Sequence, residues 1–96
     1  MTKYFVLLRH VATGFVNNLG NVYAASCADA IRMLGGKPEW SDLSHTAGFL
    51  VGCAIAGELT AKGYNIVVMD ATQFCCGTLR SAEDLEQSVR VALRRS

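Results

Sequence analysis

The 96-residue chain has few of the sequence features that are typical of enzymes with known motifs, of nucleic-acid-binding proteins or of membrane proteins. It has one proline, one tryptophan and two histidines, and its formal net charge is only +1 at pH 7. So weak a charge gives no long-range field that would attract nucleic acid or an anionic membrane. The sequence also lacks a glycine-rich phosphate loop, a paired-carboxylate motif and a helical metal-ligand motif. We therefore expect no cofactor, no metal and no membrane span.

What the chain does have is apolar content. Hydrophobic residues make up 51% of it, which argues against disorder. The length fits one domain with one core, so residues 1–96 are interpreted as a single domain. Lys3 leads into a short strand-like run without a cleavage site, unlike a signal peptide. A cytoplasmic location is the expectation that follows.

The cysteines do not have metal-site or thioredoxin-type spacing, in which two residues separate a pair of sulfurs. Cys75 and Cys76 are adjacent, and adjacent residues on a strand point to opposite faces. Cys53 lies in an apolar helical segment, where a free cysteine behaves as a small hydrophobe. With Cys27, these residues are predicted to be reduced structural thiols. A thiol or metal site at Cys75 and Cys76 is the alternative.

The longest apolar-periodic run, residues 41–62, predicts the helix around which the other elements are arranged. Ser41 is a suitable N-cap, Asp42 lies where the helix dipole favours a carboxylate, and Gly63 lies where a left-handed C-terminal residue belongs. The run is apolar nearly all round, but it is shorter than the roughly 18 to 20 residues that a membrane span needs. We expect a buried central helix in a soluble domain.

Three small residues, Gly48, Gly52 and Ala56, follow one stripe of this predicted helix. Glycine inside a helix costs about 0.5 to 1 kcal/mol relative to alanine, so the stripe should have a packing reason. Close approach of another element of this chain is the expected reason, and a partner subunit is the alternative. Just ahead of the helix, Trp40 is expected to pack on its first turn, although an exposed tryptophan would favour a binding surface.

The rest of the chain alternates between strand-like and helix-like periods. The predicted elements are a strand beginning in 3–15, a turn at 17–20, a short strand at 21–24, a helix at 27–34 capped by Ser26, a strand at 64–70, a strand or irregular segment at 71–77, and a helix at 82–95 capped by Ser81. This order predicts an α+β fold, in which a small three- to four-stranded sheet packs on the central buried helix beside two shorter flanking helices.

Two short motifs carry the sharpest hypothesis of catalysis. The run VLLRHVATGF, which contains Arg9 and His10, resembles the strand and Arg-His-Gly-acid-Thr motif of the histidine phosphatases. SHTAGF, which contains His45, resembles that family's second histidine segment. Val11 stands where the family has glycine, and Ala12 stands where it usually has an acid. Far fewer residues separate the two histidines here than in that family's fold. The resemblance implies a small hydrolase or phosphatase-like enzyme that uses Arg9 and His10, with Cys75 or His45 as a helper.

The absence of reaction motifs and the small size favour a non-enzymatic function. We expect a protein-binding module or inhibitor that occupies a surface of a larger partner, or a second copy of itself. Small proteins of phages and mobile elements that block host machinery have this size and also lack enzyme signatures. The candidate binding residues are Trp40, Gly48, Gly52, Ala56, Arg90, Arg94 and Arg95. Nucleic-acid binding through these arginines is not supported, because no aromatic residues are interleaved with them.

Overall fold

The computed structural model describes residues 1–36 and 43–94, and it confirms the α+β fold class. The elements in chain order are β1 (Thr2–His10), β2 (Val16–Ala24), α1 (Cys27–Gly35), α2 (His45–Ile55), the 3-10 helix η1 (Thr60–Lys62), β3 (Tyr64–Asp70), β4 (Cys75–Leu79) and α3 (Ala82–Arg94). The order of strands and helices matches the predicted one. The segment left open at 71–77 contributes the start of β4.

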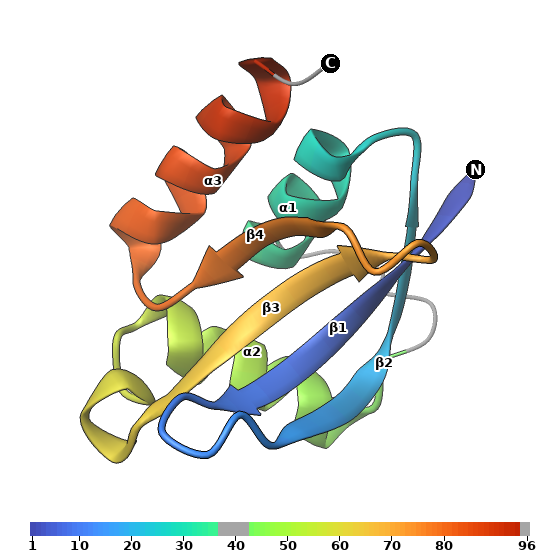
Figure 1. The fold of residues 1–96 in the computed structure, drawn as a ribbon. Coiled ribbons are helices and arrows are strands. Elements are labelled where there is room, and N and C mark those ends of the chain that lie inside the picture. Colours follow the sequence, from blue (N-terminus) through green and yellow to red (C-terminus); the bar gives the residue numbers. More distant parts are fainter. Residues whose placement is uncertain (37–42, 95–96) are drawn as a thin grey trace.

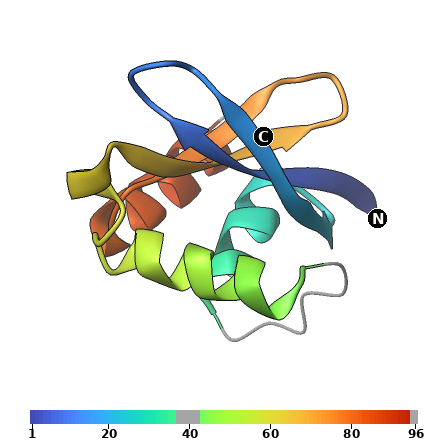
Figure 2. The ribbon, with the colours of Figure 1, turned by 90° about the horizontal axis from the view of Figure 1, so that it is seen from below.

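The four strands form one antiparallel sheet in the order β2-β1-β3-β4. In Figure 1 the two central strands, β1 and β3, lie side by side across the molecule. Figure 2 shows that α1, α2 and α3 all lie on the same side of the sheet, and that the β1–β2 and β3–β4 loops curve away from them on the other side. The sheet therefore has one covered face and one open face.

The core lies between the sheet and the three helices. Strand alternation sends Val6, Ile66 and Val68 to the covered face, where each is fully buried. Helix α1 adds Ile31 and Leu34 at helical spacing. Ser26 begins this helix as predicted, because its Oγ accepts a hydrogen bond from the Asp29 N–H. Most of the core is thus made by residues whose periodicity predicts burial.

The helix predicted over 41–62 is wrong in extent. Helix α2 begins at His45 after the N-cap Ser44, whose Oγ accepts from the Ala47 N–H at 3.1 Å. The helix ends at Ile55, and Gly57 then adopts a left-handed conformation with φ of 83°. Glycine takes this conformation without steric cost, so the chain turns here and continues through η1 to Gly63. The predicted N-cap Ser41 lies outside the described residues.

Helix α2 is also less central than expected. Only Ala47, Val51 and Ala54 are buried on it, while Phe49 is 68% exposed. Helix α3 has 13 residues against the 11 of α2, so it is longer rather than shorter than the helix it was expected to flank. It packs closely on β4: a Cβ added at Gly77 would lie 2.8 Å from Ser88 Cβ and 2.9 Å from Ile31 Cδ1. Gly77 is therefore the contact point of β4 with two helices.

The first hairpin turns earlier than predicted. The loop runs through residues 11–15, with Gly14 at φ of 73°, and the predicted turn at 17–20 belongs to β2. The register shifts there, since Val6 pairs with Gly20 and Leu7 with Asn18. The extra residue, Leu19, forms a β-bulge, and Gly20 next to it has a positive φ of 134° that glycine permits. The same residue types that predict a turn have here formed a bulge within a strand.

Candidate functional site

The open face of the sheet presents apolar side chains that no element among the described residues covers. Strand alternation places Lys3, Phe5, Leu7 and Arg9 of β1 on this face, opposite the buried Tyr4 and Val6. Phe5 and Leu7 are half-buried, and so is Met69, the register partner of Phe5 on β3, whereas Val67, the partner of Leu7, is only 1% exposed. This face lies on the far side of the sheet from the helices in Figure 2.

A hollow of about 460 Å³ lies on the open face. Its lining residues come from three strands and the β3–β4 loop: Phe5, Leu7, Val16, Met69, Asp70, Ala71 and Gln73. Five of these are apolar, and Val16 is 43% exposed. Phe15, one residue before Val16, is 63% exposed. The volume of this hollow lies within the range of about 300 to 1,000 Å³ that is typical of ligand pockets.

Arg9 lies at one end of this face and is held by a hydrogen bond to the neighbouring strand. Its Nε donates to Asn65 Oδ1 at 3.2 Å, and the two residues are register partners on β1 and β3. Asn65 is only 3% exposed and is the one buried polar residue within 1–36 and 43–94. The hydrogen bond satisfies the oxygen of the buried amide and fixes the arginine at its Nε.

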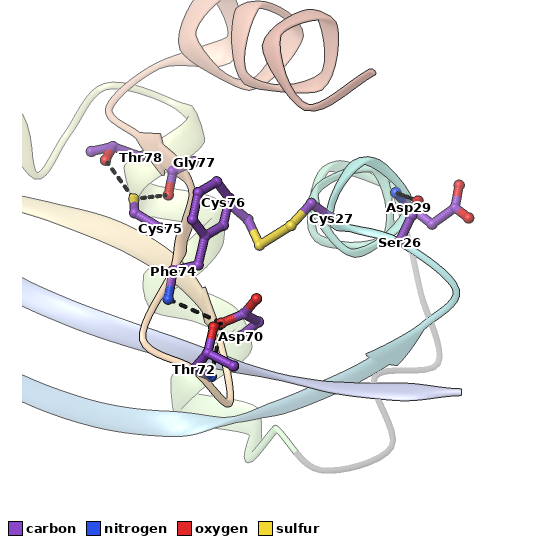
Figure 3. Close-up of a disulfide and its surroundings, with 10 residues drawn as sticks. All are labelled: Ser26, Cys27, Asp29, Asp70, Thr72, Phe74, Cys75, Cys76, Gly77 and Thr78. Carbon is purple, nitrogen blue, oxygen red and sulfur yellow. Dashed lines mark hydrogen bonds between the residues drawn. A yellow bond between two sulfur atoms is a disulfide. The ribbon is translucent and has the colours of Figure 1, made fainter. Parts of the chain in front are cut away.

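Asp70 closes the other end of the hollow and orders the β3–β4 turn (Figure 3). Its Oδ1 accepts hydrogen bonds from the Thr72 N–H at 2.9 Å, from the Thr72 hydroxyl at 2.6 Å and from the Phe74 N–H at 3.0 Å. These bonds, the Thr72 hydroxyl first, lower the pKa of Asp70 from its usual 3.8. The carboxylate is thus engaged in the turn, as expected for an aspartate in this position.

The residues of the catalytic hypothesis lie apart. His10 Nδ1 is 2.9 Å from Thr13 Oγ1, and its ring lies edge-on to Tyr64 with centroids 4.9 Å apart. His10 pairs with Tyr64 at one end of the sheet, whereas Cys75 pairs with Met69, five residues further along β3. At ~3.3 Å per strand residue this is a separation of roughly 17 Å. His45 is exposed at the start of α2.

The prediction of reduced thiols is wrong for two of the four cysteines. Cys27, the first residue of α1, forms a disulfide with Cys76 of β4, with Cα atoms 5.3 Å apart (Figure 3). They are 49 positions apart in the sequence, so only the packing of α1 against the sheet brings them together. Cys76 is buried and Cys75 is exposed, which confirms that the neighbours face opposite ways. Disulfides persist mainly in oxidising compartments, which weighs against the expected cytoplasmic location.

The two free thiols, Cys53 and Cys75, lie on different elements, α2 and β4. Cys53 is half-buried on α2, and burial, followed by a hydrogen bond with Glu58, raises the pKa of its thiol. Cys75 Sγ lies 3.7 Å from the Gly77 carbonyl oxygen. Within the described part of the chain, no group of three or more His, Cys, Asp and Glu side chains could hold a metal ion.

The predicted binding residues that the structure describes lie on α2 and α3 or at the end of α2, away from the open face. A Cβ at Gly52 would meet nothing within 4 Å, so the expected internal packing is wrong there. Gly48 is half-buried on the same helix, and Ala56, the C-cap just after it, is exposed. Arg90 pairs with Glu86 at 2.7 Å on α3, where Arg94 is also exposed. Trp40 and Arg95 lie outside the described residues.

Sequence reasoning missed the open face, although the first strand carried a signal for it. Phe5 and Leu7 alternate with Tyr4 and Val6, so the strand is apolar on both faces.

No helix in the described ranges is long and apolar enough to cross a membrane. Comparison of the chain with protein-family models, curated proteins and solved structures gives no match.

Proposed function

We propose that this protein is a non-enzymatic protein-binding module that uses the open sheet face to occupy a surface of a larger partner. The observation that carries the proposal is the hollow between Phe5, Leu7 and Met69, on a face that the chain's own helices leave uncovered. Burial of such exposed apolar surface against a partner favours binding, by about 25 cal/mol per Å² removed from water.

A protein fits this face better than a nucleic acid. Phe5 is the one aromatic residue that lines the hollow, and the remaining apolar lining is aliphatic. Binding of single-stranded nucleic acid relies on several flat aromatic platforms in a strongly basic groove. The net charge of +1 does not supply such a groove. An aliphatic hollow instead suits an apolar side chain, and a small domain seated on such a partner would block its other ligands and thereby inhibit it.

Paired capture experiments test the proposal. The wild-type protein, the open-face variant Leu7→Asp and the matched helix variant Phe49→Asp are immobilised and exposed to the same lysate of the source cells. Quantitative mass spectrometry then compares what each retains. We expect a partner that the wild type and Phe49→Asp retain equally and that Leu7→Asp loses. Of the two substituted residues, only Leu7 lines the hollow on the open face.

Two results would contradict this. Loss of the partner with Phe49→Asp alone would move the binding surface to α2, near the small-residue stripe. Retention by all three proteins would mean that neither surface carries the interaction. Light scattering on the purified protein distinguishes a further outcome: a dimeric mass that Leu7→Asp reduces to a monomer would show that a second copy covers the face.

A further inference from the structure

Arg9 is presented on the open face in a way that leaves its charge available. Among the described residues Asn65 is its one hydrogen-bond partner, and that bond uses only Nε. The guanidinium carries five N–H donors, so the four on Nη1 and Nη2 remain for a ligand. Because Asn65 is buried and Arg9 is tied to it, the guanidinium loses less freedom on binding than an unrestrained surface arginine would.

The charge of Arg9 lies beside the hollow. Along β1 it follows Leu7 on the same face, and on β2 its register partner is Val16. Leu7 and Val16 both line the hollow. A partner segment that places an apolar side chain in the hollow therefore brings its neighbouring residue close to the guanidinium.

We infer that the open face recognises an apolar side chain flanked by a carboxylate, with Arg9 as the acid-recognition residue and Asn65 as its positioning residue. This inference rests on the proposed function, and it specifies the chemistry of the partner. A planar guanidinium with two free nitrogens matches a carboxylate in a two-bond geometry. The occupant is a protein segment with Asp or Glu beside Leu, Ile, Met or Phe.

Lys3 provides the matched control. It is the other cation of β1 on this face, but it lies at the opposite end, with Nζ 5.4 Å from the centre of the Phe5 ring. Neither cation lines the hollow itself. The register partner of Arg9 on β2 is Val16, which lines the hollow, whereas that of Lys3 is Tyr23, which does not. The same loss of one positive charge at Lys3 and at Arg9 should therefore have different effects, although both change the net charge equally.

The test uses a phage-displayed library of random dodecapeptides, selected against the full chain in its disulfide-bonded form. Enriched peptides are synthesised, and their affinities are measured by fluorescence polarisation together with versions whose acidic residue is changed to its amide. Because Arg9→Ala would leave the buried Asn65 unsatisfied, the test variant is Arg9→Leu combined with Asn65→Leu, which removes both hydrogen-bonding groups. Circular dichroism and thermal unfolding confirm that this variant folds.

We expect enrichment of an acid next to an apolar residue. The acid-to-amide change should weaken binding to the wild type and to Lys3→Gln about tenfold, and should leave binding to the Arg9→Leu/Asn65→Leu variant almost unchanged. An equal loss for all three proteins would overturn the inference, while peptides lost with Leu7→Asp would still support the proposed function. Peptides that bind Leu7→Asp as well as wild type would contradict both. If a labelled single-stranded RNA dodecamer bound more tightly than the selected peptides, and bound only when Arg9 is present, the inference of a peptide partner would be overturned in favour of RNA.

Discussion

The two faces of the sheet are built from the same strands and the same kinds of residue, yet they have different fates. On β1 and β3 the covered face has Val6, Ile66 and Val68, each 0% exposed. The open face has Phe5, Leu7 and Met69, each partly exposed. Both sets alternate within one run of apolar residues. Val67, at the centre of the open face, is the exception at 1% exposed. The difference teaches that helix packing buries one whole face, whereas on the other face Phe5, Leu7 and Met69 around Val67 stay available to a partner.

The largest expected effect comes from truncating a matched pair, one residue on each face. Ile66→Ala removes a fully buried side chain, which should lower the free energy of unfolding by about 4 kcal/mol. Leu7→Ala, on the open face, should lower it by about 1 kcal/mol, because half-exposed methyl groups lose little contact. Urea unfolding followed by circular dichroism measures both. Equal losses would mean that the open face is covered in solution, for example by a second copy.

The sequence predicts most of the covered face because local signals and packing agree there. Ser26 caps α1, and Ala28, Ile31 and Leu34 follow one helical stripe into the core. The run at 64–70 is apolar on both faces, and it is a central strand as predicted. Each of these elements contains its own start signal and periodicity, so no distant part of the chain is needed to recognise it.

The rest depends on contacts that the sequence does not encode locally. Apolar periodicity continues past Ile55, but Gly57 ends the helix by taking a left-handed conformation that glycine permits without requiring. The pairing of Cys27 with Cys76 needs the tertiary packing of α1 on the sheet. The open-face site combines Arg9, Asn65 and the hollow, which strand register alone brings together. The sequence predicts that both faces of β1 are apolar, but it does not predict which face the helices cover.

The second expected effect again concerns the covered side, where a covalent bond supports the packing. Changing Cys27 and Cys76 together to serine should lower the free energy of unfolding by about 3 kcal/mol, because the disulfide closes a loop of 49 residues and restricts the unfolded chain. Cys75→Ser, at the exposed neighbour, should change it little. Thiol titration of the denatured protein should find two free thiols before reduction and four after it. Four free thiols before reduction would show that the disulfide does not form.

The smallest expected effect separates two glycines whose surroundings differ. At Gly77 an added Cβ would lie 2.8 Å from Ser88 Cβ, so Gly77→Ala should push α3 from β4 and cost about 2 kcal/mol. At Gly52 the Cβ meets nothing within 4 Å, so Gly52→Ala should stabilise α2 by about 0.5 to 1 kcal/mol. Thermal unfolding gives both signs. Because Gly52 lies on α2, away from the open face, its alanine variant should also bind the partner normally. A stabilised Gly52→Ala that loses the partner would place the binding surface on the small-residue stripe instead of on the sheet.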